Sequence, residues 1–307
     1  MVDDASPREL SLDVTDGVGE PARMVGTYFP PTSGSTGPAA LVCLPGGTYT
    51  RRYFDLEVPG RPGYSFARDA SGRGFPVVSF DMLGTGESTR PDGDVDFAVQ
   101  ARAVAAVVAQ LPDALDLEGP FVGIGHSMGG YVAVFQQALH RTYTALAILG
   151  TTNQHVAPLG LSPELAAAAE TPEGRAALVE QTVATMPRFI EAERTPMLPW
   201  FHLDDVPPAV VEADTASTLT VVPRRCAATS MVPGVAVEAA ATIDVPVLLA
   251  YGDVDVSPQP RAEPGFFPAS RDITLFLLRD SGHCHNMAGT RHVLWDRLAR
   301  WVAEVTT

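Results

Sequence analysis

The sequence contains no lysine, so all 21 of its basic residues are arginines, set against 36 acidic residues. We attribute the missing lysine to a coding bias and not to function. The resulting net charge of −15 would repel nucleic acid and anionic membranes, which argues against both as partners. The ordinary role of such a charge is solubility.

Cysteine is also scarce. Cys43, Cys226 and Cys284 are odd in number and widely separated, which argues against a disulfide framework and fits a reducing compartment. No pair has the spacing of zinc ligands, and we predict neither a metal nor a cofactor. Met1–Leu10 lacks the basic and apolar regions of a signal peptide, and no apolar run is long enough to span a bilayer. We therefore expect a cytoplasmic protein.

Short apolar runs bounded by glycine, proline or aspartate recur along the chain. Most are continuous, as in parallel strands with both faces buried. The predicted strands are Arg23–Phe29, Ala39–Leu44, Phe75–Phe80, Phe121–Gly125, Ala145–Leu149, Val245–Tyr251 and Ile273–Leu278. Thr32–Gly37 is predicted to be a turn, and helices are predicted at Phe97–Leu111, ending at Pro112, at Met128–His140 and at Val293–Val302. This alternation predicts an α/β fold with a mostly parallel, doubly wound sheet and helices on both faces.

One segment interrupts the alternation. Residues 155–241 contain no convincing buried strand, but helical stretches at Pro163–Glu170 and Thr171–Met186 and a part rich in proline and aromatic residues. An insertion of this kind between two sheet strands indicates a cap over a site. We therefore predict a core of residues 1–154 and 242–307 with a cap of residues 155–241.

A Gly-x-Ser-x-Gly motif at Gly125–Gly129 directly follows a predicted strand and directly precedes a predicted helix. This context places Ser127 on a sharp turn with its hydroxyl directed into a site. The helix N-terminus offers backbone N–H groups to a developing oxyanion. A glycine loop, Pro45–Thr48, leaves an earlier strand where a second donor is expected. We assign the oxyanion hole to the N–H groups of Gly47 and Met128.

The strand that ends at Phe80 continues into Asp81–Ser88, with the pattern Asp-x-x-Gly-x-Gly-x-Ser. In order and separation, this turn, the glycine loop and the serine motif resemble the α/β-hydrolase superfamily, and within it the serine hydrolases that carry a cap. The resemblance covers most of residues 23–154 and 243–303 and implies the α/β-hydrolase fold. We interpret Asp81 as a structural residue that ties down its turn.

Two loops near the C-terminus extend the resemblance. Gly252–Pro258 resembles the family's Gly-x-x-Asp-x-x-Pro turn, which implies that Asp255 is the triad acid, with Asp253 as the alternative on the same loop. His283 follows a glycine after the last predicted strand, at the family's position for the catalytic histidine, and His285 competes with it. A His-x-His pair also suits a metal, but no further ligand set is visible.

The resemblance implies that Ser127 attacks a carbonyl carbon while His283 takes its proton, without cofactor or metal. The identity of the leaving group stays open. We favour a carboxylic ester or a lactone of a hydrophobic small molecule, macrocyclic lactones included. A carbon–carbon bond hydrolase or a cofactor-free perhydrolase is an alternative among enzymes, and a non-catalytic ligand-binding protein is the alternative outside them.

The predicted cap supplies the candidate substrate-binding residues, Met186, Phe189, Trp200, Phe201 and His202, which would form an apolar pocket. The alternative is that they form the cap's own core. Four arginines either bind an anionic group or are solvated surface residues: Arg51, Arg52, Arg224 and Arg225. The apolar cap also suits contacts between two copies, so a homodimer is a further alternative.

Overall fold

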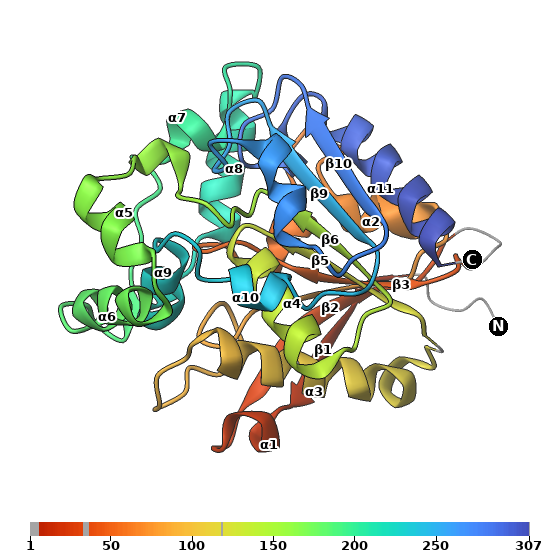
Figure 1. The fold of residues 1–307 in the computed structure, drawn as a ribbon. Coiled ribbons are helices and arrows are strands. Elements are labelled where there is room, and N and C mark those ends of the chain that lie inside the picture. Colours follow the sequence, from red (N-terminus) through yellow and green to blue (C-terminus); the bar gives the residue numbers. More distant parts are fainter. Residues whose placement is uncertain (1–5, 33–36, 118, 307) are drawn as a thin grey trace.

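The computed structural model describes residues 6–32, 37–117 and 119–306 (Figure 1). The predicted turn at Thr32–Gly37 and the start of the chain therefore lie largely outside the described residues. An eight-stranded sheet has the order β1-β2-β4-β3-β5-β6-β9-β10. Its strands are β1 Arg8–Asp13, β2 Arg23–Phe29, β3 Ala40–Leu44, β4 Val77–Phe80, β5 Phe121–His126, β6 Ala145–Leu149, β9 Val247–Gly252 and β10 Ile273–Leu278. β2 is antiparallel to β1 and β4, and the other neighbours are parallel.

Two hydrophobic cores lie on the two faces of this sheet. Alternate side chains of one strand enter different cores, as Leu41 and Val42 of β3 do, which explains why the strands read as continuous apolar runs. One core is covered by α3 and α4 and the other by α2 and α11 (Figure 1). These helices are α2 Phe66–Gly72, α3 Phe97–Leu115, α4 Met128–His140 and α11 Arg291–Val305.

All seven predicted strands are present, with ends shifted by at most two residues. The end predicted for α3 is wrong, because the helix continues through Pro112 to Leu115. The proline removes only the hydrogen bond to the carbonyl of Val108, and the buried side chains of Leu111 and Leu115 keep the last turn packed. β1 was not predicted, since its side chains alternate between exposed and half-buried at the sheet edge.

The segment between β6 and β9 contains six α-helices and a two-stranded sheet, and we call its residues 155–241 the insertion. Its helices are α5 Pro163–Ala169, α6 Pro172–Val183, α7 Leu198–Phe201, α8 Pro208–Thr218, α9 Arg224–Ser230 and α10 Val237–Ala240. The antiparallel pair β7 Phe189–Ile190 and β8 Val222–Pro223, of which only β8 is buried, was not predicted from the sequence. Two-residue strands are too short for a periodic signal. The division into core and cap stays a prediction.

The remaining short helices are α1 Thr15–Val18 and the 3₁₀ helices η1 Arg51–Phe54, η2 Ala157–Leu159, η3 Pro260–Phe266 and η4 His285–Met287. Among the described residues, no helix combines the length and apolar character needed to cross a membrane. The loops after β3, β5, β9 and β10 leave the carboxyl edge of the parallel strands. Ligands of open α/β sheets bind at this edge, and these loops carry the predicted site residues.

Candidate active site

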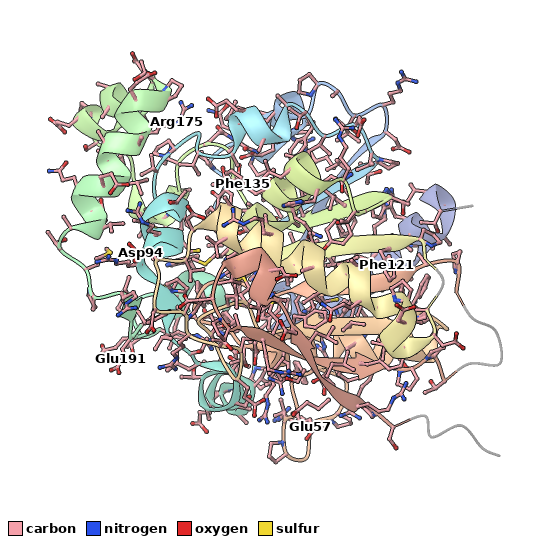
Figure 2. The ribbon with its side chains drawn as sticks, turned by 90° about the horizontal axis from the view of Figure 1, so that it is seen from below. Glu57, Asp94, Phe121, Phe135, Arg175 and Glu191 are labelled. Atoms are coloured by element: carbon pink, nitrogen blue, oxygen red, sulfur yellow. The ribbon has the colours of Figure 1, made fainter. Side chains whose placement is uncertain are left out.

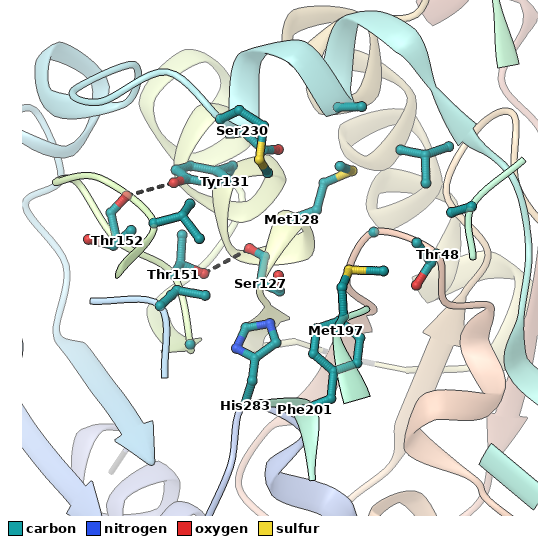
Figure 3. Close-up of a pocket in the computed structure, with 18 of the residues that line it drawn as sticks. Thr48, Ser127, Met128, Tyr131, Thr151, Thr152, Met197, Phe201, Ser230 and His283 are labelled. Carbon is teal, nitrogen blue, oxygen red and sulfur yellow. Dashed lines mark hydrogen bonds between the residues drawn. The ribbon is translucent and has the colours of Figure 1, made fainter. Parts of the chain in front are cut away.

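Ser127 lies between β5 and α4 in a strained backbone conformation. Its φ of 51° and ψ of −118° are rare for a residue with a side chain. Two hydrogen bonds hold it there: its N–H donates to the Leu149 carbonyl at 2.8 Å, and Thr151 Oγ1 donates to its carbonyl at 2.8 Å. A Cβ on Gly129 would lie 2.1 Å from the Leu44 carbonyl oxygen, so the last position of the motif requires glycine. The turn thus exposes Ser127 to the cavity shown in Figure 3.

His283 lines the same cavity from the loop after β10 (Figure 3). Its Nδ1 lies 2.7 Å from Oδ1 of Asp255, and both side chains are buried. Because a carboxylate only accepts hydrogen bonds, the proton shared in this contact belongs to His283 Nδ1. The rings of Trp200 and Phe201 lie against the imidazole, with centroids 5.2 and 5.3 Å away. The arrangement therefore places the imidazole of His283, oriented by Asp255, in the same cavity as Ser127.

Asp255 accepts four hydrogen bonds, which use both of its oxygens. His283 and the Val256 N–H contact Oδ1, while His285 Nε2 at 2.8 Å and the Gly252 N–H at 2.9 Å contact Oδ2. Burial alone would raise the pKa of Asp255, but the two histidines and their hydrogen bonds outweigh it and hold that pKa well below its usual range. Asp255 is consequently a carboxylate at neutral pH.

The two sequence alternatives, Asp253 and His285, lie in different surroundings. Asp253 is exposed and accepts a hydrogen bond from the Asp280 N–H at 2.7 Å, so it closes a turn. His285 is buried on the far oxygen of Asp255 and is not among the residues that line the cavity. The described residues contain no group of three or more histidines, cysteines or carboxylates arranged to hold a metal. The structure therefore joins His283 with Asp255 and keeps Asp253 away from both.

His126 precedes the serine and is fully buried. Its Nε2 donates to the His283 carbonyl at 2.9 Å, and its ring stacks on Tyr53 with centroids 4.3 Å apart. Burial, reinforced by the neighbouring imidazoles of His283 and His285, holds the pKa of His126 well below its usual value. His126 is therefore a neutral support for the histidine loop.

Gly47 and Met128, the predicted oxyanion donors, lie next to each other. A Cβ built on Gly47 would be 3.0 Å from Met128 Cε and 3.9 Å from its Cβ, and one built on Gly46 would be 3.0 Å from Ser127 Cβ. The glycine loop therefore packs directly against the start of α4. Both Gly47 and Met128 line the cavity together with Ser127.

The cavity beside Ser127 has a volume of about 230 Å³. Its apolar lining residues are Met128, Val156, Ile190, Ala192, Met197, Trp200, Phe201, Val222, Ala227, Met231 and Val256. Three of its hydroxyl groups are already committed, since Ser230 donates to the Cys226 carbonyl, Tyr131 to the Thr152 carbonyl and Thr151 to the Ser127 carbonyl. Within the described part of the chain, no arginine, aspartate or glutamate lines it. The cavity suits an apolar, uncharged group.

The five predicted substrate-binding residues divide into two groups. Trp200 and Phe201 line the cavity, whereas Met186, Phe189 and His202 do not. The Phe189 ring packs against the turn after β4, the Met186 carbonyl accepts from an arginine, and His202 Nε2 pairs with a buried aspartate of α8. Phe189 therefore packs the insertion against the core, and Met186 and His202 make contacts within the insertion. None of the three lines the cavity.

Sequence reasoning missed cavity residues that lie close to the recognised motifs. Tyr131 follows the serine by one helical turn, the pair Thr151 and Thr152 follows β6, and Val256 follows Asp255. Their signal is their spacing from the motif residues, because side chains one turn along α4 or next in the same loop face the same space. Composition alone gives no such signal.

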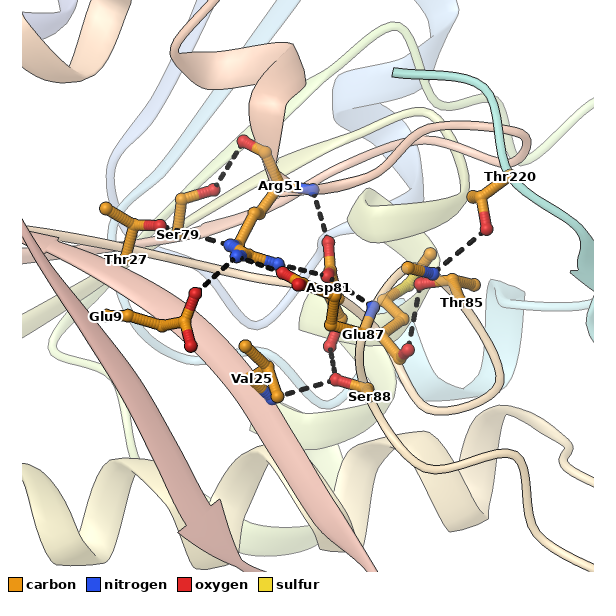
Figure 4. Close-up of polar contacts among 12 residues, drawn as sticks. Glu9, Val25, Thr27, Arg51, Ser79, Asp81, Thr85, Glu87, Ser88 and Thr220 are labelled. Atoms are coloured by element: carbon orange, nitrogen blue, oxygen red, sulfur yellow. Dashed lines mark hydrogen bonds and ion pairs between the residues drawn. The ribbon is translucent and has the colours of Figure 1, made fainter. Parts of the chain in front are cut away.

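The arginines considered for anion binding are mostly committed to ion pairs. Arg51 contacts both oxygens of Asp81 through its backbone N–H at 2.6 Å and its Nη1 at 2.5 Å, and it also pairs with Glu87 (Figure 4). Asp81 thereby ties its turn to the loop after β3. Arg224 and Arg225 both pair with an aspartate, Asp94, labelled in Figure 2. Arg52 is exposed.

The sheet order and a serine, a histidine and an aspartate at the carboxyl edge of the strands define an α/β hydrolase. The chain belongs to the alpha/beta hydrolase family, whose model matches residues 41–293.

Solved structures agree with this fold. A thermophilic esterase from Thermogutta terrifontis is 20% identical with a TM-score of 0.63, covering 98% of this chain and 100% of that one. A thermostable carboxyl esterase from Bacillus coagulans is 16% identical with a TM-score of 0.70, covering 98% and 99%. The epoxide hydrolase CorEH is 16% identical with a TM-score of 0.60, covering 98% and 100%. Such identities establish the fold alone. No curated protein sequence matches this chain significantly.

Proposed function

We propose that this protein is a serine hydrolase that cleaves a carboxylic ester or lactone of a small, uncharged, hydrophobic molecule. The observation that carries the proposal is the buried Asp255–His283 hydrogen bond of 2.7 Å beside a strained serine at the wall of an apolar cavity. The esterases among the structurally similar proteins support the same class of reaction.

The residues divide the reaction between them as follows. Ser127 Oγ attacks the carbonyl carbon while His283 Nε2 takes its proton, and Asp255 stabilises the imidazolium. The N–H groups of Gly47 and Met128 stabilise the tetrahedral oxyanion. The bond to the leaving oxygen then breaks as that oxygen takes the proton from His283. A water molecule, deprotonated by His283, then attacks the acyl carbon. The bond to Ser127 Oγ breaks as His283 returns the proton to that oxygen, which releases the carboxylic acid.

The cavity supports a substrate with a short apolar acyl group. Its volume of about 230 Å³ is below the roughly 300–1,000 Å³ typical of pockets for drug-sized ligands. This size favours small esters and lactones over macrocyclic ones. The insertion supplies Ile190, Met197, Trp200 and Ala227 to the wall, which supports the proposal that residues 155–241 act as a cap.

A fluorophosphonate probe tests the proposed nucleophile. We expect the probe to modify Ser127, as located by mass spectrometry, because this serine shares its cavity with the proposed base His283. Ser127→Ala and His283→Ala should abolish labelling, and Ser230→Ala, which alters another cavity serine, should retain it. Labelling that persists in Ser127→Ala, or a folded wild-type protein that does not react, would disprove the proposal.

Filling the cavity should change the preferred acyl chain. In Ala227→Phe, the new ring occupies space beside Met231, so kcat/KM for a p-nitrophenyl octanoate should fall by about 30-fold relative to the acetate. That factor corresponds to about 2 kcal/mol, or two to three methylenes denied burial. Ala167→Phe, at an exposed position of α5, is the matched control and should leave the ratio unchanged. An equal loss for both esters would contradict the assignment of the acyl site.

A further inference from the structure

A pair of buried charges lies inside the insertion where it meets the core. The side chains of Arg194 and Asp214 are 1% and 0% exposed, and Nη1 lies 3.4 Å from Oδ2. Asp214 Oδ2 also accepts from the Tyr49 hydroxyl at 2.8 Å and lies 3.2 Å from His202 Nε2. Because apolar residues of similar volume often stabilise a protein as well as a buried ion pair, stability alone does not account for these charges.

Arg194 reaches from the insertion to the Gly47–Thr48 loop. Its Nη2 donates to the Thr48 carbonyl at 2.5 Å and its Nε to Thr48 Oγ1 at 3.0 Å, while the guanidinium carbon lies 3.5 Å from the centroid of the Tyr49 ring. Thr48 has a φ of 70°, which is unusual for a β-branched residue and persists only where surrounding contacts hold it. The guanidinium therefore holds the strained residue that follows Gly47.

Backbone hydrogen bonds tie the same loop to the insertion. Residues 48–50 pair with residues 218–220 through two N–H···O bonds of 3.0 and 2.8 Å and an antiparallel bridge. The Tyr49 N–H also closes a turn onto the Gly46 carbonyl at 3.2 Å. That turn does not use the N–H of Gly47, the proposed oxyanion donor. The direction of this N–H is thus set by a turn that the insertion holds.

The histidine loop is attached to the same part of the insertion. The N–H groups of His283 and Cys284 donate to the carbonyls of Trp200 and Phe201, each at 2.9 Å. A Cβ on Gly282 would lie 2.7 Å from the Phe201 carbonyl oxygen, so this close approach requires the glycine. The insertion thus contacts both the loop of the base and the loop of the oxyanion donor.

We propose that Arg194, held by Asp214, is a positioning residue that fixes the Gly47–Thr48 loop in the geometry that binds the oxyanion. The proposal rests on the proposed function, since it assigns a task to the oxyanion site of that reaction. It follows that the insertion between residues 194 and 220 completes the catalytic machinery. A cover that merely swings away from the core would not need a buried guanidinium on a core carbonyl.

The test compares wild type, Arg194→Met and Arg194→Lys for hydrolysis of p-nitrophenyl butyrate and for inhibition by butylboronic acid. The boronic acid forms a tetrahedral anionic adduct with an activated serine and so reports on the oxyanion site directly. Arg194→Met should lower kcat by about 10- to 100-fold with KM changed less than about 3-fold, because a misplaced reacting group costs rate. Boronate affinity should fall by a similar factor, and Arg194→Lys should recover part of both.

Two further variants keep the test decisive. Arg225→Met removes an insertion arginine that pairs with Asp94 and Glu180 outside the cavity, and it should match wild type. Thr218→Val removes a hydroxyl that accepts from Arg194 at 2.7 Å and should weaken boronate binding even if Arg194→Met does not fold. Wild-type boronate affinity in a folded Arg194→Met or in Thr218→Val would overturn the proposal. If the wild-type protein bound no boronate, the proposed function as a serine hydrolase would be refuted, and not only the role of Arg194.

Discussion

Replacing Ser127 with alanine should lower kcat for ester hydrolysis by about 10⁴- to 10⁶-fold, the range expected when the nucleophile of a serine hydrolase is removed. The reason is that the attacking oxygen is lost while the base, the acid and the oxyanion donors stay in place. The residual rate would come from water attacking a substrate that is still bound. Steady-state kinetics with p-nitrophenyl butyrate measure the loss, and KM should change little.

The variant should be as stable as wild type, which separates a catalytic effect from unfolding. Alanine also has a Cβ, so the backbone strain at φ 51° is neither relieved nor increased. We expect the free energy of unfolding to change by less than about 1 kcal/mol, within the range of substitutions that leave the packing intact. Ser230→Ala is the matched control and should keep kcat within about 3-fold, because its hydroxyl donates to the Cys226 carbonyl and not to the substrate. Full activity in Ser127→Ala would refute the assignment of Ser127 as the nucleophile.

Much of the fold could be predicted because local sequence determines it. Ala145–Leu149 is a strand with all five residues buried, and a continuous apolar run between turn residues predicts such a strand directly. β1 escaped this criterion because an edge strand has one exposed face. Pro112 indicated a helix end, but the burial of Leu115 in the core outweighs the lost hydrogen bond.

The three residues that the sequence predicts to be catalytic each follow a strand end. Ser127, Asp255 and His283 each occupy a short turn whose glycine pattern is visible in the chain. The contact of His285 with Asp255 depends on two loops 30 residues apart, and that of Arg194 with Thr48 spans 146 residues. A single sequence contains no local signal for such pairs. The helices and strands of the insertion were harder still to predict from the sequence, since they are short and have no clear hydrophobic periodicity.

Replacing Asp255 with asparagine should lower kcat by about 10⁴-fold while Asp253→Asn lowers it less than about 2-fold. Asp255 accepts four hydrogen bonds, and an amide offers only one oxygen in place of two. If the NH₂ group faces His283, the imidazole must accept at Nδ1 and carry its proton on Nε2, where it can no longer take one from Ser127. If the oxygen faces His283, the NH₂ group opposes the Gly252 N–H, and the negative charge that stabilises the imidazolium is lost in either case.

The pH dependence of unfolding tests independently whether Asp255 is ionised in the native state. The native pKa of Asp255 lies below its usual value, whereas the unfolded chain titrates near about 3.9. Below that pH the unfolded state binds a proton that the native state does not, so this group's stabilisation is complete above about pH 5 and is lost as the pH falls. Wild type should therefore lose stability more steeply than Asp255→Asn between pH 5 and 3. The measurement is the free energy of unfolding of each protein at several pH values. If it fell equally with pH in both, Asp255 would not be the ionised partner of the two histidines.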